Sequence, residues 1–180
     1  GLGDVYKRQS HITEGVYLHT HLDEAEDEIE WALSLFPFAK NYTDIYRHFN
    51  LLGRNSIFAH CCILKEEEWQ MLHDFDCGVA HCPSSNLFLG DGMFRFWECK
   101  DAHRPVRLGV GTDVGAGTNF SIPRQLNEAY KVGMLRKKSI GALKSFYMAT
   151  KGGAQTLHLD DRIGSLEPGY EADILSLIHI

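Results

Sequence analysis

The feature that most constrains the fold is a set of short apolar runs, each ending near a polar residue able to do chemistry. The runs are typical of buried strands. They span residues 16–20, 56–59, 79–82 and 106–112. His21, His60 and Asp113 directly follow three of these runs, and His81 lies inside the fourth. Because parallel strands end at a common edge, we expect these polar side chains to converge on one rim.

Segments with helical periodicity separate the runs. Residues 24–36 begin with an acidic turn and then place apolar side chains at i, i+3, i+4 and i+7, which predicts a helix packed on a sheet. Further helices are expected over residues 66–75, 121–136 and 142–149. Alternation of strand and helix predicts an α/β fold with a parallel sheet and helices outside it. Four such units correspond to half of an eight-stranded TIM barrel.

Glycine and proline set the expected boundaries of these elements. Gly78 and the pair Gly152-Gly153 are expected to end helices. The stretch Pro83–Asn86 is expected to be a turn, and the turn-rich segment Gly164–Asp173 is expected to lead into one last strand. The loop Gly115–Gly117 lacks the spacing of a phosphate-binding motif, so it is expected to be a tight turn beside a site.

Composition excludes several classes of protein. The formal net charge is −6, which argues against non-specific binding to nucleic acid. No apolar run approaches the roughly 20 residues that span a bilayer, and no secretory signal is recognisable. The five cysteines include the adjacent pair Cys61-Cys62, which suits reduced, buried thiols better than a disulfide framework. A cytoplasmic protein without membrane or nucleic-acid partners is therefore expected.

The pair His21 and Glu24 carries the main chemical hypothesis. An imidazole can bind a metal ion, and a carboxyl group three residues later can reach a water on that ion and carry its proton. Each residue also has an ordinary interpretation: His21 could simply end a strand, Glu24 could be a solvated residue of a helix's first turn, and Asp113 could only cap a helix. His60 could be a core histidine bonded to backbone, and the same interpretation is preferred for His81.

His19 forms a His-x-His pair with His21, and strand alternation places both on one face. They could be one ligand and one neighbour. The remaining histidines are interpreted as surface or structural residues; they include His11, His48, His73, His103 and His158.

Four motifs resemble successive strand ends of the amidohydrolase superfamily. Within that superfamily, the chain most resembles the guanine deaminase family of the bacterial kind. The four motifs are His21–Glu24, Ala59–Cys61, Ala80–Asn86 and Gly111–Asp113. The stretches Asn86–Gly90, Gly111–Gly117 and Leu126–Lys131 support the guanine deaminase family. The resemblance implies that residues 10–160 are the C-terminal half of a barrel, about strands 5–8. It further implies that residues 161–175 return to a small β-domain. Residues 1–9 and 176–180 resemble translated adaptor sequence.

The resemblance also implies roles for individual residues. His21 and Asp113 would bind the metal, with zinc expected and iron as the alternative. Glu24 would be the proton shuttle, and His60 would hydrogen bond beside the metal-bound water. Catalysis would involve Glu24, His60 and Asp113, and substrate contacts would come from His21, Glu24 and Asp113. The His-x-His pair of the family's first strand is absent from this sequence.

The implied reaction is hydrolysis of guanine to xanthine and ammonia by attack of a metal-activated hydroxide. The expected partner is a small purine, and the full-length protein is expected to form a homodimer. Since only part of the ligand set is present, we expect this chain alone to bind metal weakly and to be inactive. Two alternatives stay open: another deaminase or chlorohydrolase of the superfamily, acting on adenosine-like or triazine rings, and a βα scaffold without activity.

Overall fold

The computed structural model describes residues 15–176, and its centre is a four-stranded parallel sheet in the order β1-β2-β3-β4. The strands are β1 (Leu18–Leu22), β2 (Ser56–His60), β3 (Gly78–His81) and β4 (Arg107–Val110). Neighbouring strands pair in parallel throughout: Leu18 lies opposite Ser56, and Gly78 lies opposite Arg107. The carboxyl ends of all four strands therefore lie along one edge.

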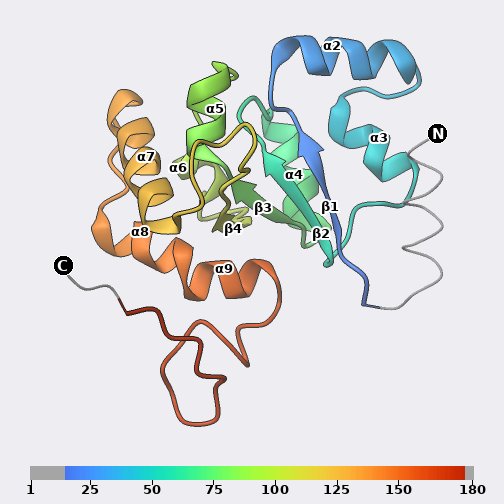
Figure 1. The fold of residues 1–180 in the computed structure, drawn as a ribbon. Helices are drawn as coiled ribbons and strands as arrows, with labels where there is room; N and C mark the ends of the chain where they lie inside the picture. Colours follow the sequence, from blue (N-terminus) through green and yellow to red (C-terminus); the bar gives the residue numbers. More distant parts are fainter. Residues whose placement is uncertain (1–14, 177–180) are drawn as a thin grey trace.

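Helices fill every connection between the strands, which gives the layered arrangement of Figure 1. The first three are α2 (Glu26–Leu35), α3 (Tyr42–His48) and α4 (Glu66–Asp74). The short helices α5 (Pro83–Leu89) and α6 (Phe96–Cys99) follow β3. After β4 come α7 (Ile122–Leu135), α8 (Ala142–Ala149) and α9 (Lys151–Thr156). Figure 1 shows α2 and α3 on the β1 side of the sheet and α7–α9 on the β4 side.

The core lies on one face of the sheet, where apolar side chains pack under the helices. Leu22, Phe58 and Val79 are fully buried there, and Trp69 of α4 is 1% exposed. On β1 the alternation of side chains buries Leu18 and Leu22 but leaves His19 and His21 exposed on the opposite face. The sheet therefore has one packed face and one open face that carries imidazoles.

The predicted α/β alternation with a parallel sheet is confirmed, and so are the buried, reduced cysteines: all five are free thiols. None of the described helices combines the length and apolar character that a bilayer crossing requires. The predicted division at residue 160 stays a prediction. Of the ends predicted to be foreign, residues 1–9 and 177–180 lie outside the described residues.

Three local predictions were wrong. The stretch predicted as a turn, Pro83–Asn86, is the start of α5, since proline fits the first turn of a helix, where its missing N–H is not needed. Gly78 begins β3 and does not end a helix. Gly152 and Gly153 lie inside α9. A fourth prediction is tested only in part: the last strand expected after Asp173 does not begin within residues 174–176, where the described part of the chain ends.

Candidate functional site

The end of β1 presents His21 and Glu24 at the sheet's carboxyl edge. Leu22, between them, is buried, so His21 takes the open face and its side chain is 59% exposed. Asp23 has a φ of 48° and turns the chain sharply after the strand. The N–H of Glu24 then bonds Glu28 Oε2 at 3.1 Å. As a result His21 Nδ1 lies 3.9 Å from Glu24 Oε2.

His60, the last residue of β2, joins this pair. Strand register places it beside Leu22, whose side chain points into the core. Its left-handed backbone, with φ 70°, breaks the alternation at this point. Its Nδ1 lies 3.0 Å from Glu24 Oε1, and its ring centroid lies 4.9 Å from that of His21. His60 Nε2 is buried and has no hydrogen-bond partner among the described residues.

A fourth residue, Asn86 of α5, completes the cluster. Its Nδ2 lies 3.0 Å from His60 Nδ1 and 3.5 Å from Glu24 Oε1. Sequence reasoning assigned no role to Asn86, because the segment was interpreted as a turn. The signal that could have found it is Pro83, which predicts a helix whose first turn carries Asn86 towards the strand ends.

The electrostatics of the cluster favour neutral forms. Burial and the neighbouring Asp91 carboxyl raise the pKa of Glu24 to about 8, so near pH 7 it holds a proton that it can give up. Burial, and then the charge of His21, lower the pKa of His60 to about 4, so this imidazole is neutral. A protonated acid beside a neutral imidazole is suited to proton transfer. Asp91 is a second residue that sequence reasoning did not single out.

A buried acid supports the site from the core side. Burial and the neighbouring Glu68 carboxyl raise the pKa of Asp23 to about 9. Its backbone carbonyl accepts hydrogen bonds from Cys62 at 3.0 Å and Ile63 at 3.2 Å. These bonds tie the turn before Glu24 to the loop after His60, and so they fix the relative positions of the two catalytic candidates.

Asp113 begins the loop after β4. The loop is a tight turn, as predicted: the N–H of Gly117 bonds the Asp113 carbonyl, and Asp113 has a φ of 47°. Burial is the largest influence on the pKa of both Glu24 and His60; the charge of Asp113 adds to the rise for Glu24 and partly opposes the fall for His60. Asp113 therefore lies near the site, but it is not among the three residues whose donor atoms lie together.

The donor atoms of three residues lie close enough to share a cation. His21, Glu24 and His60 each offer one ligand atom, and these atoms all lie within 4.8 Å of one another. Imidazole nitrogen and carboxylate oxygen are common ligands of zinc and of other transition metals. The exposed imidazole of His21 and the partly exposed carboxyl of Glu24 are compatible with such a group.

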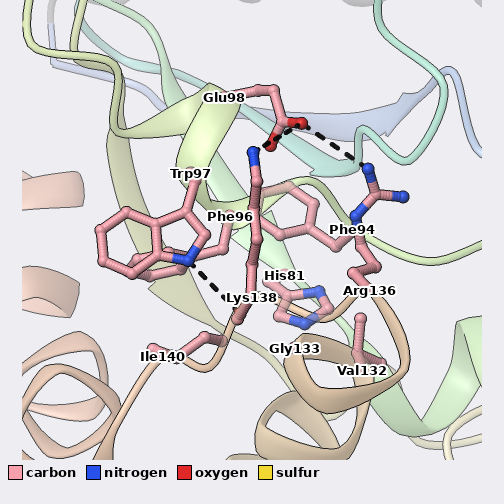
Figure 2. A pocket seen from close by; sticks show the side chains of 10 residues that line it. All are labelled: His81, Phe94, Phe96, Trp97, Glu98, Val132, Gly133, Arg136, Lys138 and Ile140. Atoms are coloured by element: carbon pink, nitrogen blue, oxygen red, sulfur yellow. Dashed lines mark hydrogen bonds and ion pairs between the residues drawn. The ribbon is translucent and has the colours of Figure 1, made fainter.

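His81 does not join the cluster. It is 1% exposed and its ring stacks on Phe94, with centroids 4.5 Å apart. Figure 2 shows it beside Gly133 and Val132 of α7, at a small cavity of about 10 Å³, enough for about one water molecule. Neither ring nitrogen has a hydrogen-bond partner among the described residues. The larger cavity, of about 280 Å³, lies between α6, β4, α8 and α9 and contains none of the candidate residues.

Comparisons with known proteins agree with this arrangement. Guanine deaminase of Escherichia coli (strain K12) is 47% identical over 162 residues, covering 88% of this chain and 36% of that relative. A solved guanine deaminase from C. acetobutylicum with bound guanine matches with a TM-score of 0.79 at 28% identity, covering 94% of this chain and 40% of that one. An adenosine deaminase from Xanthomonas campestris with bound zinc matches with a TM-score of 0.85 at 25% identity, covering 95% of this chain and 39% of that one.

The chain thus spans less than half the length of these proteins, and its four strands match part of their barrel. A profile of the Amidohydrolase family matches residues 8–178, almost the whole sequence. On this match and on the 47% identity, the chain belongs to the Amidohydrolase family.

Proposed function

We propose that this chain is the part of a metal-dependent guanine deaminase that carries the proton-transfer residues and part of the metal centre. The observation that carries the proposal is the contact between Glu24 and His60 at 3.0 Å, at the ends of adjacent parallel strands. The 47% identity to the guanine deaminase of E. coli supports guanine as the substrate. The adenosine deaminase match, at 25% identity, supports the adenosine-like alternative less well.

His21 and Asp113 would hold the metal, for which zinc is the first candidate and iron the second. The closeness of the donor atoms of His21, Glu24 and His60 supports a cation beside His21, and the zinc bound to the X. campestris relative supports zinc as that cation. The part of Asp113 follows from the family resemblance. When bound, the cation would lower the pKa of a water molecule towards 7 and make it a nucleophile near neutral pH.

Glu24 would move the protons of the reaction. Its pKa of about 8 leaves the carboxyl protonated at neutral pH, so it can give a proton to a ring nitrogen of the purine. The resulting carboxylate can take up a proton from the attacking water and pass it to the departing amine, which leaves as ammonia while guanine becomes xanthine. The neutral imidazole of His60 would hydrogen bond to the attacking water, since it is held beside Glu24.

The location and assembly of the whole protein are parts of the same proposal. Five buried free thiols support a reducing compartment such as the cytoplasm. A homodimer of the full-length protein and a return to a small β-domain at residues 161–175 follow from the family resemblance.

The test is a chimaera in which residues 15–176 replace the matching segment of the E. coli guanine deaminase. We expect it to hydrolyse guanine faster than adenosine or a triazine, and the 180-residue chain alone to show no appreciable turnover. Hydrolysis of a triazine or adenosine in preference to guanine would overturn the substrate assignment. Appreciable guanine hydrolysis by the chain alone would refute the expectation that it is inactive.

Metal binding is measured separately on the 180-residue chain by titration with zinc. His21→Ala should weaken zinc binding at least about tenfold, as loss of a ligand requires. The control is His103→Ala, because His103 is exposed and lies outside the donor group. Equal binding by both variants would contradict the role of His21.

A further inference from the structure

Asn86 is held more rigidly than a loop residue would be. It lies in the first turn of α5, which begins directly after β3 with Pro83. Its backbone N–H bonds the Cys82 carbonyl at 3.1 Å, and its own carbonyl accepts from Gly90 at 3.0 Å and from Asp91 at 3.1 Å. The residue is 1% exposed. Its side chain therefore has a fixed origin and little room to change rotamer.

The amide of Asn86 meets two acceptors with a single nitrogen. Nδ2 lies 3.0 Å from His60 Nδ1 and 3.5 Å from Glu24 Oε1. An amide nitrogen carries two hydrogens, so it can donate to both atoms at once. Neither a carboxylate nor a hydroxyl can do this from one atom, because the first has no hydrogen and the second has one.

The opposite orientation of the amide is less favourable. With Nδ2 facing His60, the buried atom left without a partner among the described residues is one carbonyl oxygen, Oδ1. Turning the amide would leave both N–H groups in that position, and it would set two oxygens, those of Asn86 and Glu24, against each other. Burying an unpaired donor or acceptor has a free-energy cost of about 1–3 kcal/mol per group, which favours the first orientation.

We propose that Asn86 is a positioning residue that fixes His60 as the tautomer protonated on Nε2 and holds the Glu24 carboxyl beside it. Nδ1 of His60 accepts from Asn86, so the ring hydrogen resides on Nε2. With one nitrogen accepting and the other protonated, His60 offers a hydrogen-bond donor at Nε2. The catalytic meaning of this assignment rests on the proposed function, but the tautomer itself does not.

The test is a long-range ¹H–¹⁵N correlation spectrum of the metal-free 180-residue chain with labelled histidine. The His60 signals are assigned with His60→Gln. We expect Nδ1 to resonate as a bare ring nitrogen and Nε2 as a protonated one. Asn86→Asp keeps the shape but removes both donors, so the hydrogen should move to Nδ1. Asn127→Asp, on the exposed side of α7, is the matched control and should leave His60 unchanged.

Two outcomes would overturn the proposal. One is a protonated Nδ1 in the unmodified chain, which would mean that His60 donates to Glu24 instead. The other is an Asn86→Asp chain that is folded by its amide spectrum yet keeps the original tautomer. If Asn86→Asp does not fold, the spectrum of the unmodified chain decides: a bare Nδ1 supports the proposal and a protonated Nδ1 overturns it.

The spectrum also separates this proposal from the proposed function. A chimaera that hydrolyses no guanine would refute the function and leave the His60 tautomer intact. A merely structural role for Asn86 would lower the stability of Asn86→Ala without moving the ring hydrogen.

Discussion

His60 Nδ1 lies 3.0 Å from Glu24 Oε1, and the two residues come from the ends of adjacent strands, β2 and β1. His60 is fully buried, whereas the side chain of Glu24 is 14% exposed. The carboxyl therefore has one oxygen against a fixed imidazole and a narrow opening to the site. This geometry makes Glu24 the residue whose chemistry is most directly testable.

Replacing Glu24 by glutamine keeps its shape and removes its proton. In the chimaera with the E. coli enzyme, kcat for guanine should fall by about 10²–10⁴-fold, the usual contribution of a positioned general acid or base. Glu26→Gln, an exposed change in the first turn of α2, should leave kcat unchanged. An active Glu24→Gln chimaera would favour the scaffold interpretation of this chain.

The stability of the chain should depend on pH through His81. Burial, and then the charge of His60, lower the pKa of His81 from 6.5 to about 3. Between these values the unfolded chain binds a proton that the folded chain does not, so stability is full above about pH 6.5 and is lost as the pH falls towards 3. The loss due to this one group is about 5 kcal/mol at most.

Urea unfolding between pH 3 and 7 measures this dependence. His81→Gln should flatten the curve relative to the unmodified chain, whereas His103→Gln, at an exposed position, should leave the slope unchanged. His60 also titrates in the acid range, but it is present in all three chains. The difference between the unmodified chain and His81→Gln therefore reports on His81. Parallel curves for all three chains would contradict the assignment.

Arg104 should contribute more to the free energy of unfolding than Arg162, which forms a similar ion pair at the surface. Arg104 is 4% exposed, binds Glu66 through two nitrogens and donates Nη1 to the Glu98 carbonyl at 2.7 Å. Arg104→Ala leaves that part-buried carbonyl without its charged donor and should lower the free energy of unfolding by about 2–3 kcal/mol. Arg162 makes a similar pair with Glu171, but both side chains are more than half exposed.

Because solvent screens that second pair, Arg162→Ala should change the free energy of unfolding by less than about 0.5 kcal/mol. Denaturant titration of the two variants side by side makes the comparison. Equal losses in the free energy of unfolding would mean that the burial of Arg104 adds nothing to the stability of the chain.

Gly117→Ala should disturb the loop that carries Asp113. A Cβ at this position would lie 1.8 Å from the Thr112 carbonyl oxygen, and the turn cannot close around it. We expect a loss of about 1–3 kcal/mol in the free energy of unfolding, with weaker zinc binding if Asp113 is a ligand. Gly53→Ala is the control, since no atom lies within 4 Å of its added Cβ. Similar stability of both variants would be incompatible with the tight turn.

The sequence predicted the structure best where an apolar run typical of a strand ends at a residue able to bind metal or transfer protons. The runs before His21, His60 and Asp113 all became strands or strand ends, because short apolar runs between turns and helical segments leave few other structures. Convergence of His21, Glu24 and His60 followed from the parallel order of the strands. The exact roles of these residues remain proposals.

Local rules failed where packing between distant segments decides the structure. Gly152 and Gly153 were expected to end a helix, yet both lie inside the next helix, α9, which begins at Lys151. The reason is close packing: a Cβ on Gly109 of β4 would lie 3.3 Å from the Cα of Gly153, so helix and strand touch without side chains between them. Asn86 and Asp91 were missed for a similar reason, since only the fold brings α5 to Glu24.

The parallel sheet has a consequence for handling this chain in solution. β1 and β4 each hydrogen bond to one neighbouring strand in the described structure, so their outer sides present rows of amide and carbonyl groups towards any strand that approaches. Two copies can satisfy those groups by pairing edge strand with edge strand. We therefore expect self-association that grows with protein concentration.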